Sequence, residues 1–115
     1  MPQENKIKLS VVIPVYNEAP YLPGLFEDLI KYFDTNDTEI IIVDDGSNDG
    51  STEIINDFKL NKNYNIDYKT IRLDINSGKG KAIRIGIKNS CGEYVLLGPV
   101  GVRFENRKTN QGRPA

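Results

Sequence analysis

Three short runs of this chain are apolar at nearly every position, without the alternation typical of a sheet that has one face in water. They cover residues 9–15, 39–43 and 93–97, and the first two are rich in valine and isoleucine. Such residues favour strands, and runs of this length that are apolar throughout indicate strands buried on both faces. Residues 68–73 are more mixed, and we expect them to form one further strand between the second and third runs.

Between these runs, apolar residues recur at intervals of three and four positions, which predicts amphipathic helices. We expect helices over residues 21–33 and 51–59, and a third that opens at 76–78 and ends at 89–92. Gly92 suits a left-handed C-cap for the last of these. Strands that alternate with helices in the order βαβαβαβ predict an α/β fold with a mainly parallel sheet and right-handed crossovers.

The chain has the composition of an ordinary globular protein of 115 residues. Its net charge of −1 is too small to favour nucleic acid or an anionic membrane as a partner. The absence of histidine removes the commonest general base and metal ligand, so carboxylates would have to serve in either role. Cys91 is the single cysteine, which fits a reducing cytoplasm. The polar start predicts no signal peptide, and no apolar run approaches the roughly 20 residues of a membrane helix.

Candidate chemistry follows the ends of the predicted strands. In an open parallel sheet, ligands bind beyond the carboxyl ends of the strands, and three loops there carry polar groups. These groups are Tyr16 and Glu18, Asp44 and Asp45, and Lys79 and Lys81 in a glycine-rich loop that opens a helix. An aromatic ring can stack on a base, carboxylates can accept hydrogen bonds from base or ribose, and lysines at a helix N-terminus can face phosphate.

Each of these features also has a purely structural interpretation. Asp44 and Asp45 precede a glycine and could form a polar turn, Tyr16 could be half-buried packing, and the lysines could be a solvated helix start. Three known motifs are excluded by their spacing: the dinucleotide fingerprint, the P-loop and the EF-hand loop. Because three separate loops bring these groups to the same carboxyl edge of the predicted sheet, we favour a nucleotide site.

Four segments together resemble a known family. Val11–Glu18, Val43–Thr52 and Gly92–Leu97 are similar in order and spacing to the amino-terminal half of family 2 glycosyltransferases, over about residues 8–97. The resemblance implies an incomplete, Rossmann-like GT-A fold and an inverting transfer of sugar from a UDP- or GDP-sugar. Asn76–Gly86 is more similar to the branch that makes dolichyl- or polyprenyl-phosphate sugars, which implies a lipid phosphate as acceptor.

The resemblance also implies roles for individual residues. Tyr16 would lie beside the base, and Asp45 would hold base or ribose next to the Val43 backbone. Lys79 and Arg84 would be neighbours of the diphosphate. The full set implied to bind the nucleotide sugar is Pro14, Tyr16, Glu18, Val43, Asp44, Asp45, Lys79 and Arg84.

The chain departs from the family pattern after Leu97. In the family an Asp-x-Asp motif follows and holds Mg²⁺ or Mn²⁺ on the donor diphosphate, whereas here Gly98–Gly101 follows, with no aspartate in residues 98–115. We therefore expect neither a metal ligand nor a catalytic residue in this chain. We expect a partial GT-A domain over residues 1–97 and an irregular basic tail over 98–115, as a truncation, a frameshift or a misjudged gene boundary would leave.

These expectations combine into one functional prediction with two alternatives. The chain is predicted to be the donor-binding half of a cytoplasmic glycosyltransferase, inactive alone, whose full-length form works at the cytoplasmic membrane face. One alternative is a non-catalytic module that binds a nucleotide or a partner. The other is a fragment that does not fold stably, because an uncovered fourth strand exposes a sheet edge.

Overall fold

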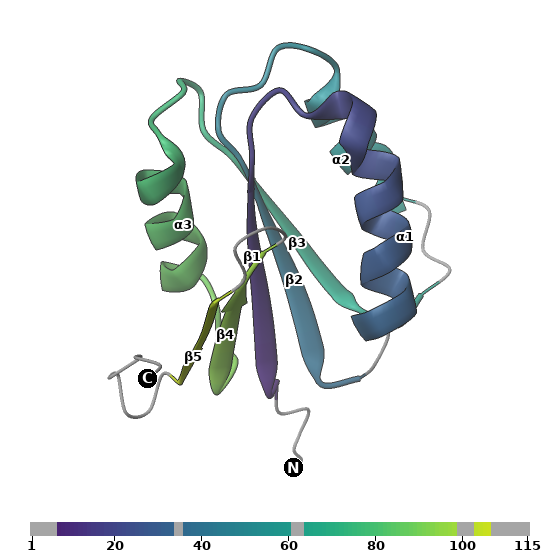
Figure 1. Cartoon of the computed structure of the whole chain (residues 1–115), viewed down its shortest axis with the longest axis vertical. Helices are drawn as coiled ribbons and strands as arrows, with labels where there is room; N and C mark the ends of the chain where they lie inside the picture. Colours follow the sequence, from purple (N-terminus) through teal and green to yellow (C-terminus); the bar gives the residue numbers. More distant parts are fainter. Residues whose placement is uncertain (1–6, 34–35, 61–63, 99–102, 107–115) are drawn as a thin grey trace.

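A computed structural model describes residues 7–33, 36–60, 64–98 and 103–106 of the chain (Figure 1). One sheet contains the strands β1 (Leu9–Val15), β2 (Thr38–Asp44), β3 (Asp67–Arg72), β4 (Tyr94–Leu97) and β5 (Arg103–Asn106). The helices are η1 (Ala19–Tyr21), α1 (Leu22–Phe33), α2 (Ser51–Leu60) and α3 (Lys79–Lys88). The predicted strands and helices are all present, with boundaries within about two residues of the expected ones apart from the start of the third helix.

The sheet has the strand order β3-β2-β1-β4-β5. β1 pairs in parallel with both β2 and β4, and β2 pairs in parallel with β3, which confirms the predicted parallel α/β fold. β5 pairs antiparallel with β4. The prediction of an irregular tail was therefore wrong for residues 103–106, and a free edge on β4 explains why, because its unpaired backbone groups can accept another strand. Residues 99–102 and 107–115 lie outside the described part of the chain.

Helices cover both faces of the parallel strands, which is why β2 is buried at every position (Figure 1). α1 and α2 lie on one face and α3 on the other. On the α3 face, Gly86 lets the helix approach the sheet, since a Cβ there would lie 2.4 Å from Val12 Cγ1. The core cluster on this face consists of Val12, Ile41, Val43, Ala82 and Val95.

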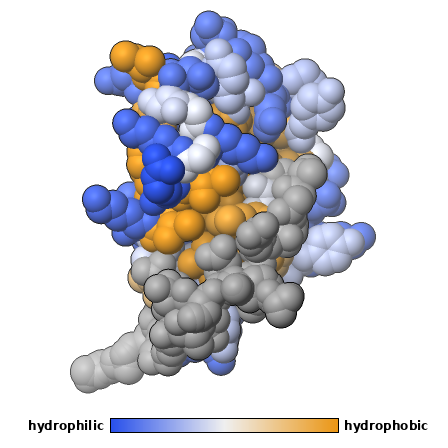
Figure 2. All heavy atoms as spheres, turned by 60° about the vertical axis from the view of Figure 1, so that its left-hand side comes forward, coloured by the Kyte–Doolittle hydropathy of each residue, from blue (hydrophilic) through white to orange (hydrophobic). Residues whose placement is uncertain are grey.

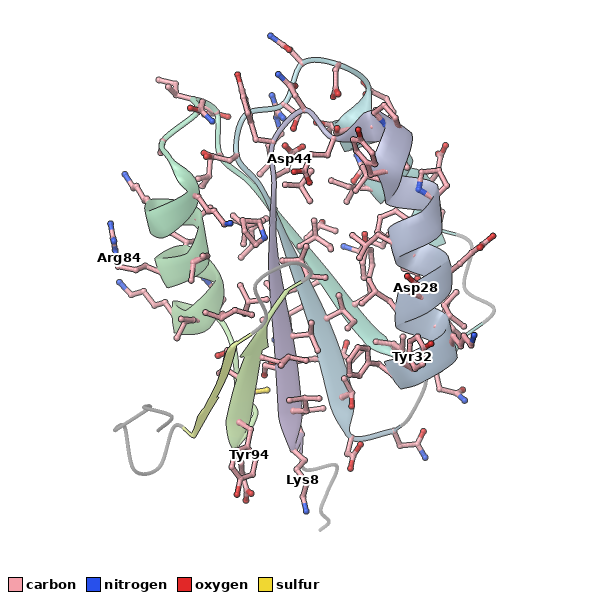
Figure 3. The ribbon with its side chains drawn as sticks, in the orientation of Figure 1. Lys8, Asp28, Tyr32, Asp44, Arg84 and Tyr94 are labelled. Carbon is pink, nitrogen blue, oxygen red and sulfur yellow. The ribbon has the colours of Figure 1, made fainter. Side chains whose placement is uncertain are left out.

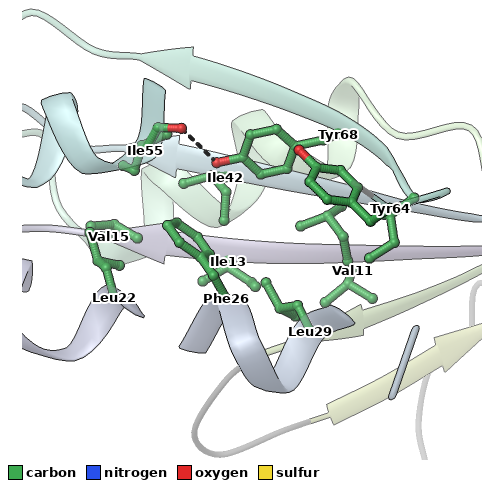
Figure 4. Close-up of a cluster of buried hydrophobic side chains, with 12 residues drawn as sticks. Val11, Ile13, Val15, Leu22, Phe26, Leu29, Ile42, Ile55, Tyr64 and Tyr68 are labelled. Carbon is green, nitrogen blue, oxygen red and sulfur yellow. Dashed lines mark hydrogen bonds between the residues drawn. The ribbon is translucent and has the colours of Figure 1, made fainter. Parts of the chain in front are cut away.

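Aromatic rings fill the space between α1, α2 and β3. Phe58 stacks on Phe26 with ring centroids 4.2 Å apart and on Tyr64 at 4.7 Å. The Tyr68 hydroxyl donates a hydrogen bond of 3.2 Å to the Ile55 carbonyl, so its polar end is satisfied within the core (Figure 4). Burial, together with the nearby Tyr64, raises the pKa of Tyr68 well above its usual range, so the hydroxyl stays neutral.

A buried polar network joins the amino-terminal ends of the strands on the α3 face. Glu39 of β2 is fully buried, and its Oε2 accepts hydrogen bonds from Ser10 Oγ at 2.5 Å and from the Cys91 amide at 2.8 Å. Its Oε1 lies 2.9 Å from Lys69 Nζ on β3. Burial alone would raise the pKa of Glu39, but the hydrogen bonds from Ser10 and Cys91 and the Lys69 ammonium together lower it.

Gly92 belongs to the same network, and its role differs from the predicted one. Among the described glycines, those with positive φ are Gly46, Gly50 and Gly78, so Gly92 is not a left-handed cap. Its amide donates to Ser10 Oγ at 2.9 Å, and a Cβ at this position would lie 2.8 Å from the Ser10 backbone nitrogen. Glycine is needed here because two backbone segments approach closely.

Candidate nucleotide site

A pocket of about 300 Å³ lies at the carboxyl ends of β1 and β2, beside the start of α3. This is the edge of a parallel sheet at which ligands bind in open α/β folds. The three loops that follow β1, β2 and β3 all contribute to it, as the sequence predicted. Its lining consists of Pro14, Val15, Tyr16, Glu18, Asp45, Asn76, Gly78, Lys79 and Gly98.

The loop after β1 is fastened to the loop after β2. The Asn17 amide donates to Ser47 Oγ at 2.9 Å, and Asn17 Oδ1 accepts from the Asn48 amide at 2.8 Å. The Glu18 amide donates to Ser51 Oγ at 3.0 Å. Asn17 adopts a left-handed φ of 51°, a conformation that asparagine tolerates better than most residues. These hydrogen bonds fix the backbone around Asn17, and so position the neighbouring pocket side chains Tyr16 and Glu18.

Asp49, two residues before α2, adds hydrogen bonds to the contact between these two loops. Its Oδ2 accepts from the Ala19 amide at 3.2 Å, and its Oδ1 accepts from both the amide and the hydroxyl of Ser51. The hydrogen bond from the Ser51 hydroxyl is the main reason that the pKa of Asp49 is lowered. With its backbone held in this way, Tyr16 lines the pocket and is 44% exposed.

Asp44, the first carboxylate of the pair, does not line the pocket. Its Oδ1 accepts from the Ser47 amide at 3.0 Å, and its Oδ2 accepts from the Thr52 hydroxyl and from Arg72 Nη1 at 3.2 Å. The same Arg72 nitrogen donates to the Ser47 carbonyl and to Thr52 Oγ1. Asp44, labelled in Figure 3, therefore connects the end of β2 to the loop that follows it, to α2 and to β3.

We expect Asp44→Ala to lower the free energy of unfolding by about 2–3 kcal/mol. The substitution removes a buried carboxylate that accepts charge-assisted hydrogen bonds, and leaves the Ser47 amide without its acceptor. Urea unfolding at pH 7 measures the loss, and Asp57→Ala on the exposed side of α2 is a control with the same change of side chain. Equal stability of the two variants would contradict this structural role.

Asp45, the second carboxylate, lies in the wall of the pocket and is 2% exposed. Its Oδ1 accepts from the Ser77 amide at 2.7 Å, and its Oδ2 accepts from the Gly78 amide at 2.9 Å and from Asn76 Nδ2 at 3.1 Å. A carboxylate offers about four acceptor positions, so roughly one remains for a ligand. Asp45 thus holds the loop that leads into α3.

Gly46 allows these two loops to meet. It has a φ of +79°, and a Cβ added there would lie 2.7 Å from the Asn76 backbone nitrogen. Any other residue would be strained by this backbone conformation and would also collide with the neighbouring loop. The glycine after the acidic pair is therefore required by the contact between residues 45–46 and 76–78.

The structure brings together five of the eight residues that the sequence implied: Pro14, Tyr16, Glu18, Asp45 and Lys79. The other three lie elsewhere. Val43 is fully buried in the core under α3, Asp44 makes the contacts described above, and Arg84 points away from the sheet on the outer side of α3 (Figure 3). Sequence reasoning missed the pocket contacts of Asn76 and Gly78, although the Asn-x-Gly pattern before a helix was a usable signal.

The chain matches the family model of glycosyl transferase family 2 over residues 10–97, which includes the β1 and β2 loops and the Asn76–Lys79 segment. The chain belongs to this family. The human dolichyl-phosphate beta-glucosyltransferase is 39% identical over 98 residues, which are 78% of this chain and 30% of the relative. The undecaprenyl-phosphate 4-deoxy-4-formamido-L-arabinose transferase of Aeromonas hydrophila is 40% identical over 93 residues, 78% of this chain and 28% of the relative.

Solved structures agree with this family assignment. Staphylococcus aureus TarS 1–349 in complex with UDP-GlcNAc is 33% identical with a TM-score of 0.70, and the match covers 79% of this chain and 26% of that one. A mannosyltransferase from Pyrobaculum calidifontis, solved with GDP-Man and Mn²⁺, has a TM-score of 0.72 at 21% identity and shares the fold. This chain spans about 30% of the length of the first curated relatives. No helix within the described residues is long and apolar enough to cross a membrane.

Proposed function

We propose that this chain forms the donor-binding part of an inverting glycosyltransferase that takes its sugar from a nucleotide-diphosphate sugar. The observation that carries the proposal is the pocket itself, in which an exposed ring, two carboxylates and a lysine converge from three loops. The relatives named for dolichyl and undecaprenyl phosphate support a lipid phosphate as the acceptor.

The proposed binding mode follows from the chemistry of each group. Tyr16 stacks on the base at the mouth of the pocket, and Asp45 uses its remaining acceptor position for a base or ribose donor. Glu18 accepts from the ribose hydroxyls. Lys79 is the first residue of α3, so its ammonium and the free amides of that helix start are the groups that meet the diphosphate.

A divalent cation on the diphosphate would neutralise the charge that develops on the leaving group. The described residues of this chain contain no group of three or more potential ligands among His, Cys, Asp and Glu. Of the two pocket carboxylates, Asp45 already accepts three hydrogen bonds. We therefore assign no step of the reaction to a metal held by these residues.

Calorimetric titration of the chain with UDP, GDP, UDP-GlcNAc and GDP-mannose, each with and without Mn²⁺, tests the proposal. We expect a dissociation constant between micromolar and millimolar for at least one of these nucleotides, with little dependence on Mn²⁺. Adenosine monophosphate serves as a control for non-specific binding. Failure to detect binding of any uridine or guanosine ligand at millimolar concentration would refute the proposed function.

A further inference from the structure

The helix α3 carries an unusual concentration of positive charge. Within Lys79–Lys88 there are four cations and no acidic residue, whereas α1 and α2 each carry two acids and one lysine. The sheet separates these helices, so the helices on its two faces carry opposite net charge although the chain as a whole carries −1. A local field of this kind attracts an anionic partner to the α3 side.

The outward side of α3 combines these cations with apolar surface. Lys81, Arg84 and Lys88 are exposed there, and the half-buried Ile85 and Ile87 lie beside them around a shallow groove of about 450 Å³. We call these five residues the α3 outer face. Ile87 also packs against the core cluster under α3. Figure 2 brings the α3 side of the molecule forward and shows hydrophilic side chains beside exposed apolar surface.

We propose that the α3 outer face is a docking surface for anionic lipid headgroups at a bilayer surface. Clustered lysine and arginine side chains bind anionic leaflets, and the half-buried Ile85 beside them can enter the boundary between headgroups and acyl chains. Nucleic acid fits this surface less well, since α3 has no aromatic residue on which a base could stack.

This orientation also suits the proposed acceptor, and in that respect it rests on the proposed function. Lys79 at the start of the helix lines the nucleotide pocket, so a bilayer in contact with α3 would lie close to one side of that pocket. A lipid phosphate would then reach the donor from the membrane plane. The docking surface itself can be tested without any nucleotide, and the two proposals can fail separately.

Sedimentation with vesicles tests the docking surface on the full chain, without nucleotide. We expect binding to phosphatidylcholine vesicles that contain 30% phosphatidylglycerol at low salt, and none to pure phosphatidylcholine. Each basic residue near an anionic surface contributes about a fivefold factor, so the triple variant Lys81→Gln/Arg84→Gln/Lys88→Gln should bind roughly 100-fold more weakly. Added salt should weaken the wild-type interaction, because charges beyond about 10 Å are screened at 0.1 M.

The matched control is Lys8→Gln/Lys31→Gln/Lys59→Gln, which makes the same change in net charge at exposed positions outside α3. It should keep most of the binding, and circular dichroism checks that both triple variants are folded. Three outcomes would overturn the proposal: no binding to anionic vesicles, an equal loss in the two triple variants, or a single-stranded oligonucleotide bound more tightly than the vesicles. Loss of nucleotide binding with vesicle binding intact would contradict only the proposed function.

Discussion

Asp45→Ala should weaken the binding of UDP or GDP at least tenfold, and should do so more than any other single substitution in the pocket. The variant loses the acceptor offered to the nucleotide, and a hydrogen bond to a charged group contributes about 1.5–3 kcal/mol, which corresponds to roughly 10–150-fold in affinity. It also releases the Ser77 and Gly78 amides, which leaves the start of α3 without its fixed position beside the pocket. Calorimetry with the nucleotide that binds the wild type measures the effect.

Two further variants separate the roles of the neighbouring carboxylates. Asp45→Asn keeps the shape but replaces one acceptor oxygen with a donor group, so it should also bind weakly. Asp44→Ala should retain nucleotide binding at temperatures where it is folded, because its contacts are with Ser47, Thr52 and Arg72 and not with the pocket. The opposite pattern, with binding kept in Asp45→Ala and lost in Asp44→Ala, would show that the assignment of the pair is reversed.

Glu39→Gln should lower the free energy of unfolding at pH 7 by about 2 kcal/mol. The glutamine side chain has no negative charge to pair with Lys69. Its NH₂ group is a hydrogen-bond donor, and it would face one of the donors that the carboxylate now accepts from, which are Ser10 Oγ, the Cys91 amide and Lys69 Nζ. We keep the figure modest because Lys69 is 41% exposed, so solvent screens part of the ion pair. Chemical unfolding followed by circular dichroism measures the change.

The same residue predicts a pH dependence with a definite sign. Its pKa in the folded protein is lower than the ordinary value of 4.5, so the unfolded state binds the proton more readily. The stability that Glu39 contributes is therefore present above about pH 4.5 and is lost as the pH falls through the lowered folded-state pKa. Glu39→Gln should show a smaller loss of stability over this acid range, and an unchanged acid profile would contradict the role of the network.

The sequence predicted the parallel strands and their helices because their apolar patterns are nearly uninterrupted. β2 is buried at all seven positions, and a short β-branched run that is apolar almost throughout is typical of a strand covered on both faces. The tail was harder, since β5 (Arg103–Asn106) has no marked pattern of its own and owes its conformation to pairing with β4. Gly92 was misinterpreted because a close approach of two backbones depends on residues 82 positions apart.

In the candidate site, the motif located the correct loops but could not distinguish the directions of neighbouring side chains. Asp44 and Asp45 are adjacent, yet one contacts Arg72 on β3 and the other contacts the 76–78 loop. The Arg72 contact could not be anticipated, since it depends on how β3 pairs with β2. Arg84 was assigned by resemblance, and the structure places it on the outward side of α3 with Lys81 and Lys88.

The network around Glu39 also has a consequence for strand alignment. Side chains alternate between the faces of a sheet, so sliding β2 by one residue relative to β1 would turn Glu39 toward α1 and α2. Its carboxylate would then enter the layer formed by Phe26, Phe58 and Tyr68, far from Ser10 and Lys69. The cost of burying an unpaired charge there excludes the shifted alignment. Glu39 at one end of β2 thus ensures that Asp45, just beyond the other end, arrives on the pocket side.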